Sequence, residues 1–407
     1  MANSDDRRLD LVVFGATSFV GQILCRHLVD RHGTGGSLRW AIAGRNRAKL
    51  DEVAAATGAD VERIVVDADD AAALADLAKS TRVVVSTVGP YALYGSPLIA
   101  AVAAAGTDYC DLSGEPQWMR KMIDAHSHAA SASGARIVHA CGFDSIPSDL
   151  GVWFTQQRAL EAFDEPCTRI DMWVKGFKGG ASGGTIASMM NLMAETSADP
   201  ALRKLLADPY VLAPPDLRNG PPQPEITRPV KDEAGEWLAP FVMAAVNTRI
   251  VQRSHALLGR PWGPSFRYRE SMAMGSGPVG AAKAGAVAGG VLATMRLSAV
   301  GPLRTFLGKV LPKPGEGPSP EAQATGYFDL RFTGTTADGR TINTKVTGDR
   351  DPGYGSTAKM LGETAVALLD LDAADVPGGF WTPSTAFGDR LVERLEAHAG
   401  LSFNVLP

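Results

Sequence analysis

The chain has 407 residues, of which 45% are apolar and 21% charged, and its formal net charge is -4 at pH 7. This length exceeds what one hydrophobic core usually organises, so the sequence predicts a globular protein of two domains. The weak negative charge gives no general basis for nucleic-acid binding, and we expect no such partner. The polar start lacks a secretion signal, and the four cysteines form no C-x-x-C pair. Both features indicate a cytoplasmic protein with reduced thiols.

The first 145 residues alternate short apolar runs with helical patterns. Such alternation is typical of βαβ units around a parallel sheet, whose right-handed crossovers place helices on both faces. The sequence therefore predicts an α/β fold with a Rossmann-like, doubly wound parallel sheet in residues 1–145. Its strands are expected at 9–14, 38–43, 61–66, 82–86 and 136–140, and its helices at 19–31, 47–57, 70–79, 95–105 and 117–133.

The first expected strand ends in "FGATSFVG", residues 14–21. Gly15 allows a tight turn, and Gly21 allows close packing of the next helix on the strand. Small hydroxyl residues, Thr17 and Ser18, lie between them, where helix N–H groups can meet a phosphate. A turn without a ligand is the alternative. From this segment we assign Gly15, Ala16, Thr17, Ser18, Phe19 and Gly21 to a dinucleotide site.

Residues after the second strand indicate which dinucleotide binds. An NAD site usually has an acidic residue there, but this chain has Gly44 and Arg45, and its next acid is Asp51. A guanidinium can hold a 2′-phosphate through paired N–H donors, so the sequence predicts NADP(H). The alternative is that Arg45 is a solvated residue at a helix start. Asp67, after the third strand, is expected near the adenine.

The fourth strand leads into "VVSTVGPYALYGSP", residues 84–97. Strand carboxyl ends line the ligand crevice of such sheets, so we assign Thr87, Val88, Gly89 and Pro90 to the cofactor site. Tyr91 and Tyr94 are expected to point toward the nicotinamide end. Packing at a domain edge explains either tyrosine equally well.

The pattern changes after residue 145, and residues 146–350 are expected to form an α+β domain with a mixed or antiparallel sheet, for substrate binding or oligomerisation. The last part, 351–407, reads as helices with an interruption at 377–383, which we expect to pack back on the first domain. Residues 208–240 read as an irregular excursion and 311–320 as a linker. Strands are expected at 168–177, 241–257, 265–274, 325–335 and 340–348, and a helix at 182–197.

Several motifs in chain order resemble the saccharopine dehydrogenase-like oxidoreductases, and within them the trans-acting enoyl reductases. This resemblance implies an NADPH-dependent reductase that acts in trans on polyketide synthases during lipid assembly. Its substrate would be an α,β-unsaturated thioester on an acyl carrier protein. The motifs are "FGATSFVGQ" (14–22), "AGR" (43–45), "STVGPYALYGSPL" (86–98), "GTDYCDLSGE" (106–115), "ACGFDSIPSDL" (140–150), "NTRIVQRS" (247–254), "RYRESM" (267–272) and "PKPGEGPS" (312–319).

Enoyl reduction needs a hydride, a stabilised enolate and a proton for the α-carbon. The Tyr-x-x-x-Lys pair of short-chain reductases is absent. We expect Tyr91 or Tyr94 to donate the proton. Asp144 is a further candidate if burial raises its pKa, although an N-cap of the next helix explains it better. His126 and His128 lie two apart on an expected helix, so no metal site follows.

Other functions stay open at this stage. One is a saccharopine-type dehydrogenase acting on a small amino-acid-derived imine, and another is a non-catalytic nucleotide-binding scaffold at a membrane or lipid surface. The Gly/Ala-rich window 277–295 is too short to span a membrane. Close packing in a homo-oligomer or at a peripheral membrane contact explains it better than an acyl groove.

Overall fold

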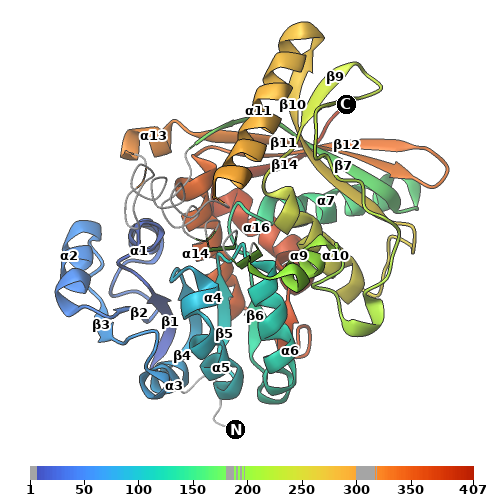
Figure 1. Cartoon of the computed structure of the whole chain (residues 1–407). Coiled ribbons are helices and arrows are strands. Elements are labelled where there is room, and N and C mark those ends of the chain that lie inside the picture. The colour runs from blue at the N-terminus through green and yellow to red at the C-terminus, as the bar shows by residue number, and fades with distance from the viewer. Residues whose placement is uncertain are drawn as a thin grey trace.

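The computed structural model describes residues 7–179, 188, 191–192, 195–196, 198–298, 317 and 319–407, and these form two seven-stranded sheets (Figure 1). The helix expected at 182–197 and the linker expected at 311–320 fall almost wholly outside the described residues. In Figure 1 the first sheet lies below the second, and the carboxyl ends of its strands face the second half of the molecule. No helix in the described ranges is long and apolar enough to cross a membrane.

The first sheet, sheet A, has the strand order β13-β6-β5-β4-β1-β2-β3, and its paired strands run parallel. This confirms the predicted Rossmann-like sheet. Order reverses at β1, whose neighbours are β2 and β4, and such a switch point opens a ligand crevice at the carboxyl edge. The strands are β1 (Leu9–Phe14), β2 (Trp40–Gly44), β3 (Glu62–Val65), β4 (Thr81–Ser86), β5 (Asp108–Asp111), β6 (Arg136–Val138) and β13 (Gly379–Trp381).

Helices cover both faces of sheet A. The helices that follow its strands are α1 (Phe19–His32), α2 (Arg47–Thr57), α3 (Ala71–Ser80), α4 (Tyr91–Tyr94), α5 (Ser96–Ala105) and α6 (Pro116–Ser133). A further helix from the end of the chain, α14 (Thr357–Leu369), packs beside α1 against β4 and β5. The C-terminal part of the chain therefore supplies both a helix and the edge strand β13 to the first sheet.

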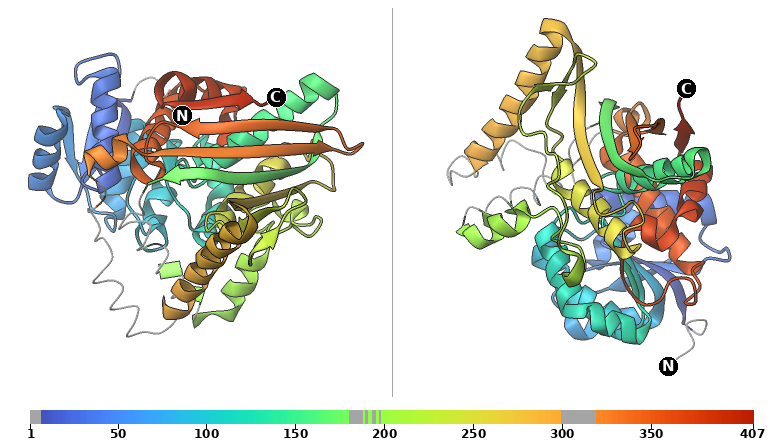
Figure 2. Two further views of the ribbon diagram at one scale, coloured as in Figure 1. Left: turned by 90° about the horizontal axis from the view of Figure 1, so that it is seen from above. Right: turned by 90° about the vertical axis from the view of Figure 1, so that its right-hand side faces the viewer.

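The second sheet, sheet B, has the order β14-β12-β11-β7-β10-β9-β8. Its strands pair antiparallel, except for the parallel pair β7 and β10, so the sheet is mixed as predicted. Helix α7 (Ile146–Phe163) packs on one face, and the left view of Figure 2 shows the long strands from the opposite side. The strands are β7 (Cys167–Lys178), β8 (Val230–Lys231), β9 (Glu236–Ala239), β10 (Arg267–Ser276), β11 (Tyr327–Thr336), β12 (Thr341–Gly348) and β14 (Leu401–Val405).

One predicted strand is wrong, because residues 241–257 form the helix α10 (Ala244–Leu257) instead. Every residue from Val246 to Ala256 is buried. A helix buried on all sides lacks the one-sided apolar stripe that identifies a helix, and its β-branched residues imitate a strand. The other elements are α9 (Pro200–Ala207), α11 (Gly277–Ser298), α13 (Pro320–Ala324), α15 (Pro383–Phe387), α16 (Asp389–His398), a 3-10 turn (Pro215–Leu217) and a π-helical turn (Pro352–Ser356).

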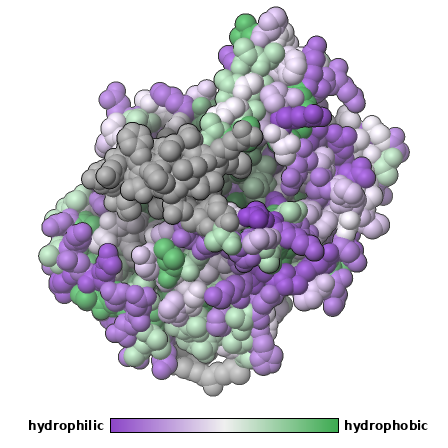
Figure 3. Space-filling view, in the orientation of Figure 1, coloured by the Kyte–Doolittle hydropathy of each residue, from purple (hydrophilic) through white to green (hydrophobic). Residues whose placement is uncertain are grey.

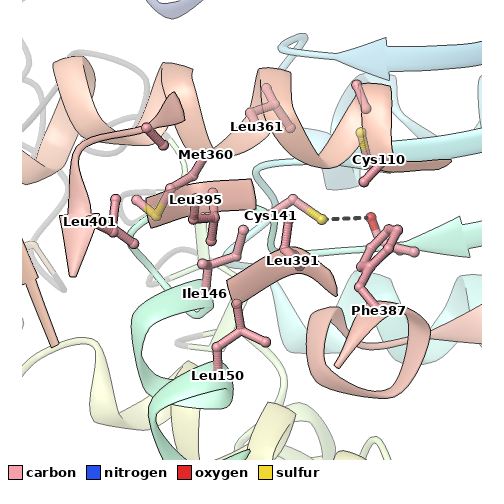
Figure 4. Close-up of a cluster of buried hydrophobic side chains, with 14 of the residues drawn as sticks. Cys110, Cys141, Ile146, Leu150, Met360, Leu361, Phe387, Leu391, Leu395 and Leu401 are labelled. Carbon is pink, nitrogen blue, oxygen red and sulfur yellow. Dashed lines mark hydrogen bonds between the residues drawn. The ribbon is translucent and has the colours of Figure 1, made fainter. Parts of the chain in front are cut away.

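One buried hydrophobic cluster includes residues of both sheets. Figure 4 draws part of it, with Cys110 of β5 and Cys141 beside labelled side chains of α7, α14 and α16. Cys141 lies in this cluster, and its thiol donates to the carbonyl oxygen of Val138 at 3.3 Å. All four cysteines are free and buried. Because the last part of the chain contributes a strand to each sheet, the domain division at residues 145 and 350 stays a prediction.

A buried carboxylate ties helix α1 to the C-terminal helices. Glu363 of α14 is 1% exposed and lies 2.8 Å from His27 Nε2, 3.3 Å from Arg31 Nε and 2.8 Å from Arg394 Nε. Burial raises the pKa of this carboxyl, but the His27 hydrogen bond and the neighbouring arginines outweigh burial and hold the pKa at about 2. The ion cluster therefore clamps the helix that begins at the predicted cofactor turn.

Replacing this carboxylate should destabilise the protein in a pH-dependent way. Glu363→Gln is expected to lower the unfolding free energy by about 2–4 kcal/mol at pH 7, since it leaves buried cations unpaired. A depressed native pKa contributes stability above the unfolded pKa and loses it as pH falls toward the native value. The difference from wild type, measured by urea unfolding, should therefore shrink between pH 5 and pH 3. Glu62→Gln, at an exposed ion pair with Arg8, is the control and should cost at most about 1 kcal/mol.

Candidate cofactor and active site

The turn between β1 and α1 fits a dinucleotide only because two positions have no side chain. Gly15 has φ +90°, and a Cβ there would lie 2.6 Å from Val88 Cγ2 and 2.8 Å from Thr87 Oγ1. At Gly21 a Cβ would lie 2.4 Å from the carbonyl oxygen of Gly15. The turn, the helix and the loop after β4 are thus in direct contact at the carboxyl edge. This leaves the backbone N–H groups at the start of α1 accessible to a phosphate.

Ser18 occupies the place of the usual middle glycine and stabilises this turn. Its hydroxyl caps α1 by accepting from Gly21 N at 2.9 Å and lies 2.9 Å from Thr87 Oγ1. Thr87 donates to the carbonyl oxygen of Gly15 at 2.8 Å, so the Ser18 proton goes to Thr87. A hydroxyl has one proton to donate. Ser18 would have to rotate to donate to a phosphate, and that role stays a prediction.

Adding one methyl group to the turn tests its role. Gly21→Ala forces the Gly15 carbonyl or the helix to move, because the new Cβ would be 2.4 Å from that oxygen. We expect NADPH affinity to fall at least tenfold in a calorimetric titration, because the N–H groups around the pyrophosphate shift. Gly35→Ala is the control, since a Cβ at Gly35 has nothing within 4 Å. Equal NADPH affinity in both variants would contradict the assignment.

At the end of β2 the structure places one cation without a partner. Arg45 is exposed and forms no ion pair within the described part of the chain. Its neighbour Arg47 instead pairs with Asp51 at 3.1 Å, and Asn46 caps α2. Arg45 is thus free to meet a 2′-phosphate. Asp67 is exposed after β3, where its carboxylate accepts from Asp69 N at 3.2 Å, and its adenine contact stays a prediction.

The loop after β4, with Thr87, Val88, Gly89 and Pro90, continues the crevice beyond the turn. It leads into α4, whose first two N–H groups, at Tyr91 and Ala92, donate to the carboxylate of Glu115 at 2.8 and 2.9 Å. Glu115 is buried, and burial raises its pKa. Glu115 occupies the N-cap position of α6, but its side chain forms no capping hydrogen bond there and fixes the position of α4.

The two predicted proton donors have different environments. Tyr91 is 5% exposed, and its hydroxyl donates to the carbonyl oxygen of Ser86 at 2.9 Å and accepts from Leu112 N at 3.1 Å. This geometry favours a structural role for Tyr91. Tyr94 is 39% exposed, and its hydroxyl has no hydrogen-bond partner among the described residues. Tyr94 therefore remains the accessible member of the pair.

Asp144 differs from the N-cap that the sequence favoured. Ser145 occupies the N-cap position of α7, and the Asp144 carboxylate forms no hydrogen bond or ion pair with described residues. This half-buried carboxylate lies beside the loop after β5: a Cβ on Gly114 would be 3.7 Å from Asp144 Oδ2. Burial raises its pKa to about 6. A carboxyl with this pKa can deliver a proton near neutral pH.

Known proteins resemble this chain over nearly its whole length. The saccharopine dehydrogenase NADP-binding domain family matches residues 11–138. A protein of Mycobacterium tuberculosis, provisionally named a trans-acting enoyl reductase, is 44% identical over 97% of both chains. The trans-acting enoyl reductase of Mycobacterium ulcerans is 40% identical, again over 97% of both chains.

The chain belongs to the trans-acting enoyl reductase family. It is thus an NADP-binding oxidoreductase of the saccharopine dehydrogenase group. Its fold resembles apo saccharopine dehydrogenase (L-Glu forming) of Saccharomyces cerevisiae, with a TM-score of 0.53 and 13% identity, over 98% of this chain and all of that one. The predicted family and fold class are both confirmed.

In this enoyl reductase family member, a segment that the sequence did not assign to the site packs against the turn after β1. Tyr354, in the π-helical turn before α14, packs edge-on against Phe19 with ring centroids 4.8 Å apart. Thr357 accepts from Phe143 N at 2.9 Å and lies close to Gly142. The start of α14 therefore meets both the cofactor turn and the loop that carries Asp144. The sequence signal for this contact is "DPGYGST", residues 351–357, and such a composition is typical of any tight turn.

Three of the enoyl reductase-like motifs, at 140–150, 247–254 and 267–272, meet in a buried polar network close to Asp144 in the chain. Asn247 of α10 accepts from Ser145 Oγ at 3.0 Å and donates to Ser148 Oγ at 3.1 Å and Glu270 Oε2 at 3.0 Å. Tyr268 donates to Glu270 Oε1 at 2.7 Å. All five side chains are at most 2% exposed, and burial raises the pKa of Glu270 to about 7. The network fixes the start of α7, next to Asp144.

Proposed function

We propose that the chain is an NADPH-dependent enoyl reductase that reduces an α,β-unsaturated acyl thioester carried by a polyketide synthase in lipid biosynthesis. The observation that carries the proposal is Asp144, a carboxyl with a raised pKa and no hydrogen bond or ion pair to described residues, which lies beside the loop after β5. The relatives that are named trans-acting enoyl reductases support the reaction class. The carrier-bound lipid substrate rests on that likeness.

The residues present fit NADP(H). A Cβ at Gly15 or Gly21 would clash with the chain, so these glycines allow the tight turn that a pyrophosphate needs, and Arg45 supplies an unpaired guanidinium directly after β2. When bound, NADPH supplies the hydride that reduces the β-carbon. Asp144 then gives its proton to the α-carbon, so that the reaction consumes one proton with each NADPH. In this proposal Tyr94 donates a hydrogen bond to the thioester oxygen as negative charge develops there.

The test is an NADPH oxidation assay with crotonyl-pantetheine and with longer enoyl-pantetheines. We expect turnover with NADPH, a saturated thioester product by mass spectrometry, and little rate with NADH. An assay with amino acid and 2-oxo acid pairs runs in parallel. Turnover of those pairs and not of enoyl thioesters would replace the proposal by a saccharopine-type reaction. Tight NADPH binding without turnover of either class would support the scaffold alternative.

A further inference from the structure

Helix α11 exposes an unusually apolar surface. It packs on β9 and β10 through Gly280 and Ala284, which are buried. Its exposed residues between Gly277 and Ala293 are glycine, alanine, proline, valine and leucine, with Lys283 as the single charged residue among them. Val279 is 67% exposed and Leu292 is 50% exposed. A helix that is apolar on both sides is normally buried, so the outer face of α11 indicates a binding surface.

Helix α9 offers a second apolar face of the same kind. Leu202, Leu205 and Leu206 follow a helical spacing on one side, whereas Arg203 and Lys204 lie on the other. None of its residues is buried, and Leu205 is 36% exposed. This is the pattern of helices that lie in a lipid interface.

The two helices project on the same side of the molecule. In the right view of Figure 2 both extend to the left, and in the left view both extend downward, which is the side that faces the viewer in Figure 1. Figure 3 shows this side, where the surface over α11 is mostly white and green beside a largely purple region. The two helices therefore face the same direction.

The charged residues around the two helices indicate which kind of surface they bind. Neither α9 nor α11 contains Asp or Glu. Of the two acids that flank α9, Asp199 caps its N-terminus, and Asp208 accepts from Tyr210 N at 2.8 Å. Arg203 and Lys204 of α9 and Lys283 of α11 are exposed, although the whole chain has a net charge of -4. Exposed apolar side chains with excess basic charge match an anionic bilayer.

We propose that α11 and α9 dock the protein on the surface of an anionic lipid bilayer. The helices lie along the interface and insert Val279, Leu292 and Leu205 below the head groups, while Lys204 and Lys283 meet the phosphates. No described helix is suited to cross the bilayer, so the contact is peripheral. This inference stands apart from the reaction, because it concerns binding alone.

Co-sedimentation of the full chain with vesicles tests the proposal. We expect binding to vesicles of phosphatidylcholine and phosphatidylglycerol, weaker binding to phosphatidylcholine alone, and loss of binding at high salt. Val279→Asp and Leu292→Asp should each reduce the bound fraction about tenfold, since each removes an inserted group and adds a repelled charge. Leu205→Asp should act in the same direction.

Matched controls come from apolar residues that are equally exposed elsewhere. Val65 is 53% exposed and Leu160 is 40% exposed, so Val65→Asp and Leu160→Asp should leave vesicle binding unchanged. Thermal unfolding of every variant confirms folding. Equal binding to both vesicle types, or equal loss in the controls, would overturn the proposal. So would light scattering that shows α11 variants breaking a dimer of a chain that binds no vesicles, because the occupant would then be a second copy.

Discussion

Replacing Asp144 with asparagine is expected to reduce kcat by about 100- to 10,000-fold with the enoyl thioester, the usual range for loss of a general acid. The wild-type kcat should fall as pH rises above about 6, because the carboxyl whose pKa burial raises to about 6 then loses its proton. The variant should lose this limb of the profile. Steady-state rates between pH 5 and pH 9 measure both effects, with NADPH affinity titrated separately.

The same substitution should stabilise the folded protein. A carboxyl whose native pKa lies above its unfolded value loses stability as pH rises from the unfolded to the native pKa, here from about 4 to about 6. Asp144→Asn removes that penalty, so its unfolding free energy at pH 8 should exceed wild type by about 1–3 kcal/mol. The gain should vanish near pH 4. Urea unfolding at pH 4, 6 and 8 measures the difference.

Asp164→Asn provides the control, since Asp164 lies at the other end of α7 and is exposed. It should change neither kcat nor stability beyond about 0.5 kcal/mol. A variant of Asp144 that keeps full rate and an unchanged pH profile would show that the proton comes from elsewhere. Tyr94→Phe would then be the next variant to test.

Replacing Arg45 should change cofactor preference more than any other substitution at the adenosine end. Arg45→Ala removes the guanidinium that is free to pair with a 2′-phosphate, and kcat/KM for NADPH should fall about 10- to 100-fold. Arg45→Asp should lower it further through repulsion. Neither change should alter kcat/KM for NADH more than a few fold, because NADH has no 2′-phosphate.

Arg47→Ala is the matched control. This substitution removes the same charge two residues away, at a guanidinium that already pairs with Asp51. Its loss should leave the NADPH to NADH ratio within about twofold. If both arginine variants lower NADPH use equally, general charge and not a specific phosphate contact sets the preference.

Local patterns in the sequence were enough to predict five of the seven strands of sheet A and the turn between β1 and α1. Strands that are buried on both faces read as apolar runs, and Gly15 and Gly21 stand where a short turn admits no Cβ. The second strand, expected at 38–43, is Trp40–Gly44, so Arg45 directly follows it. These features depend on contacts within one βα unit, so that their signals lie close together in the chain.

The remaining features depend on contacts between distant residues. Nothing near Tyr91 in the sequence reveals that Leu112 N reaches its hydroxyl, nor that Glu115 caps α4. Asp144 looked like an N-cap because a loop aspartate before a helix usually is one. The short β5 escaped notice because its four residues begin and end with aspartate. Helix α10 escaped notice because its buried residues include polar ones such as Arg249 and Arg253, so no one-sided apolar stripe marks it in the sequence.

The edge strand β13 affects how this chain can fold while it is being synthesised. Sheet A begins at Leu9, yet its last strand is Gly379–Trp381, paired with β6. Tyr354, which packs against Phe19, and Glu363, which pairs with His27, also lie near the C-terminal end of the sequence. An N-terminal domain of this kind cannot complete its folding during synthesis, as N-terminal domains generally do. A nascent chain of the first 145 residues would expose the surface that α14 covers, and cofactor binding must await release of nearly the whole polypeptide.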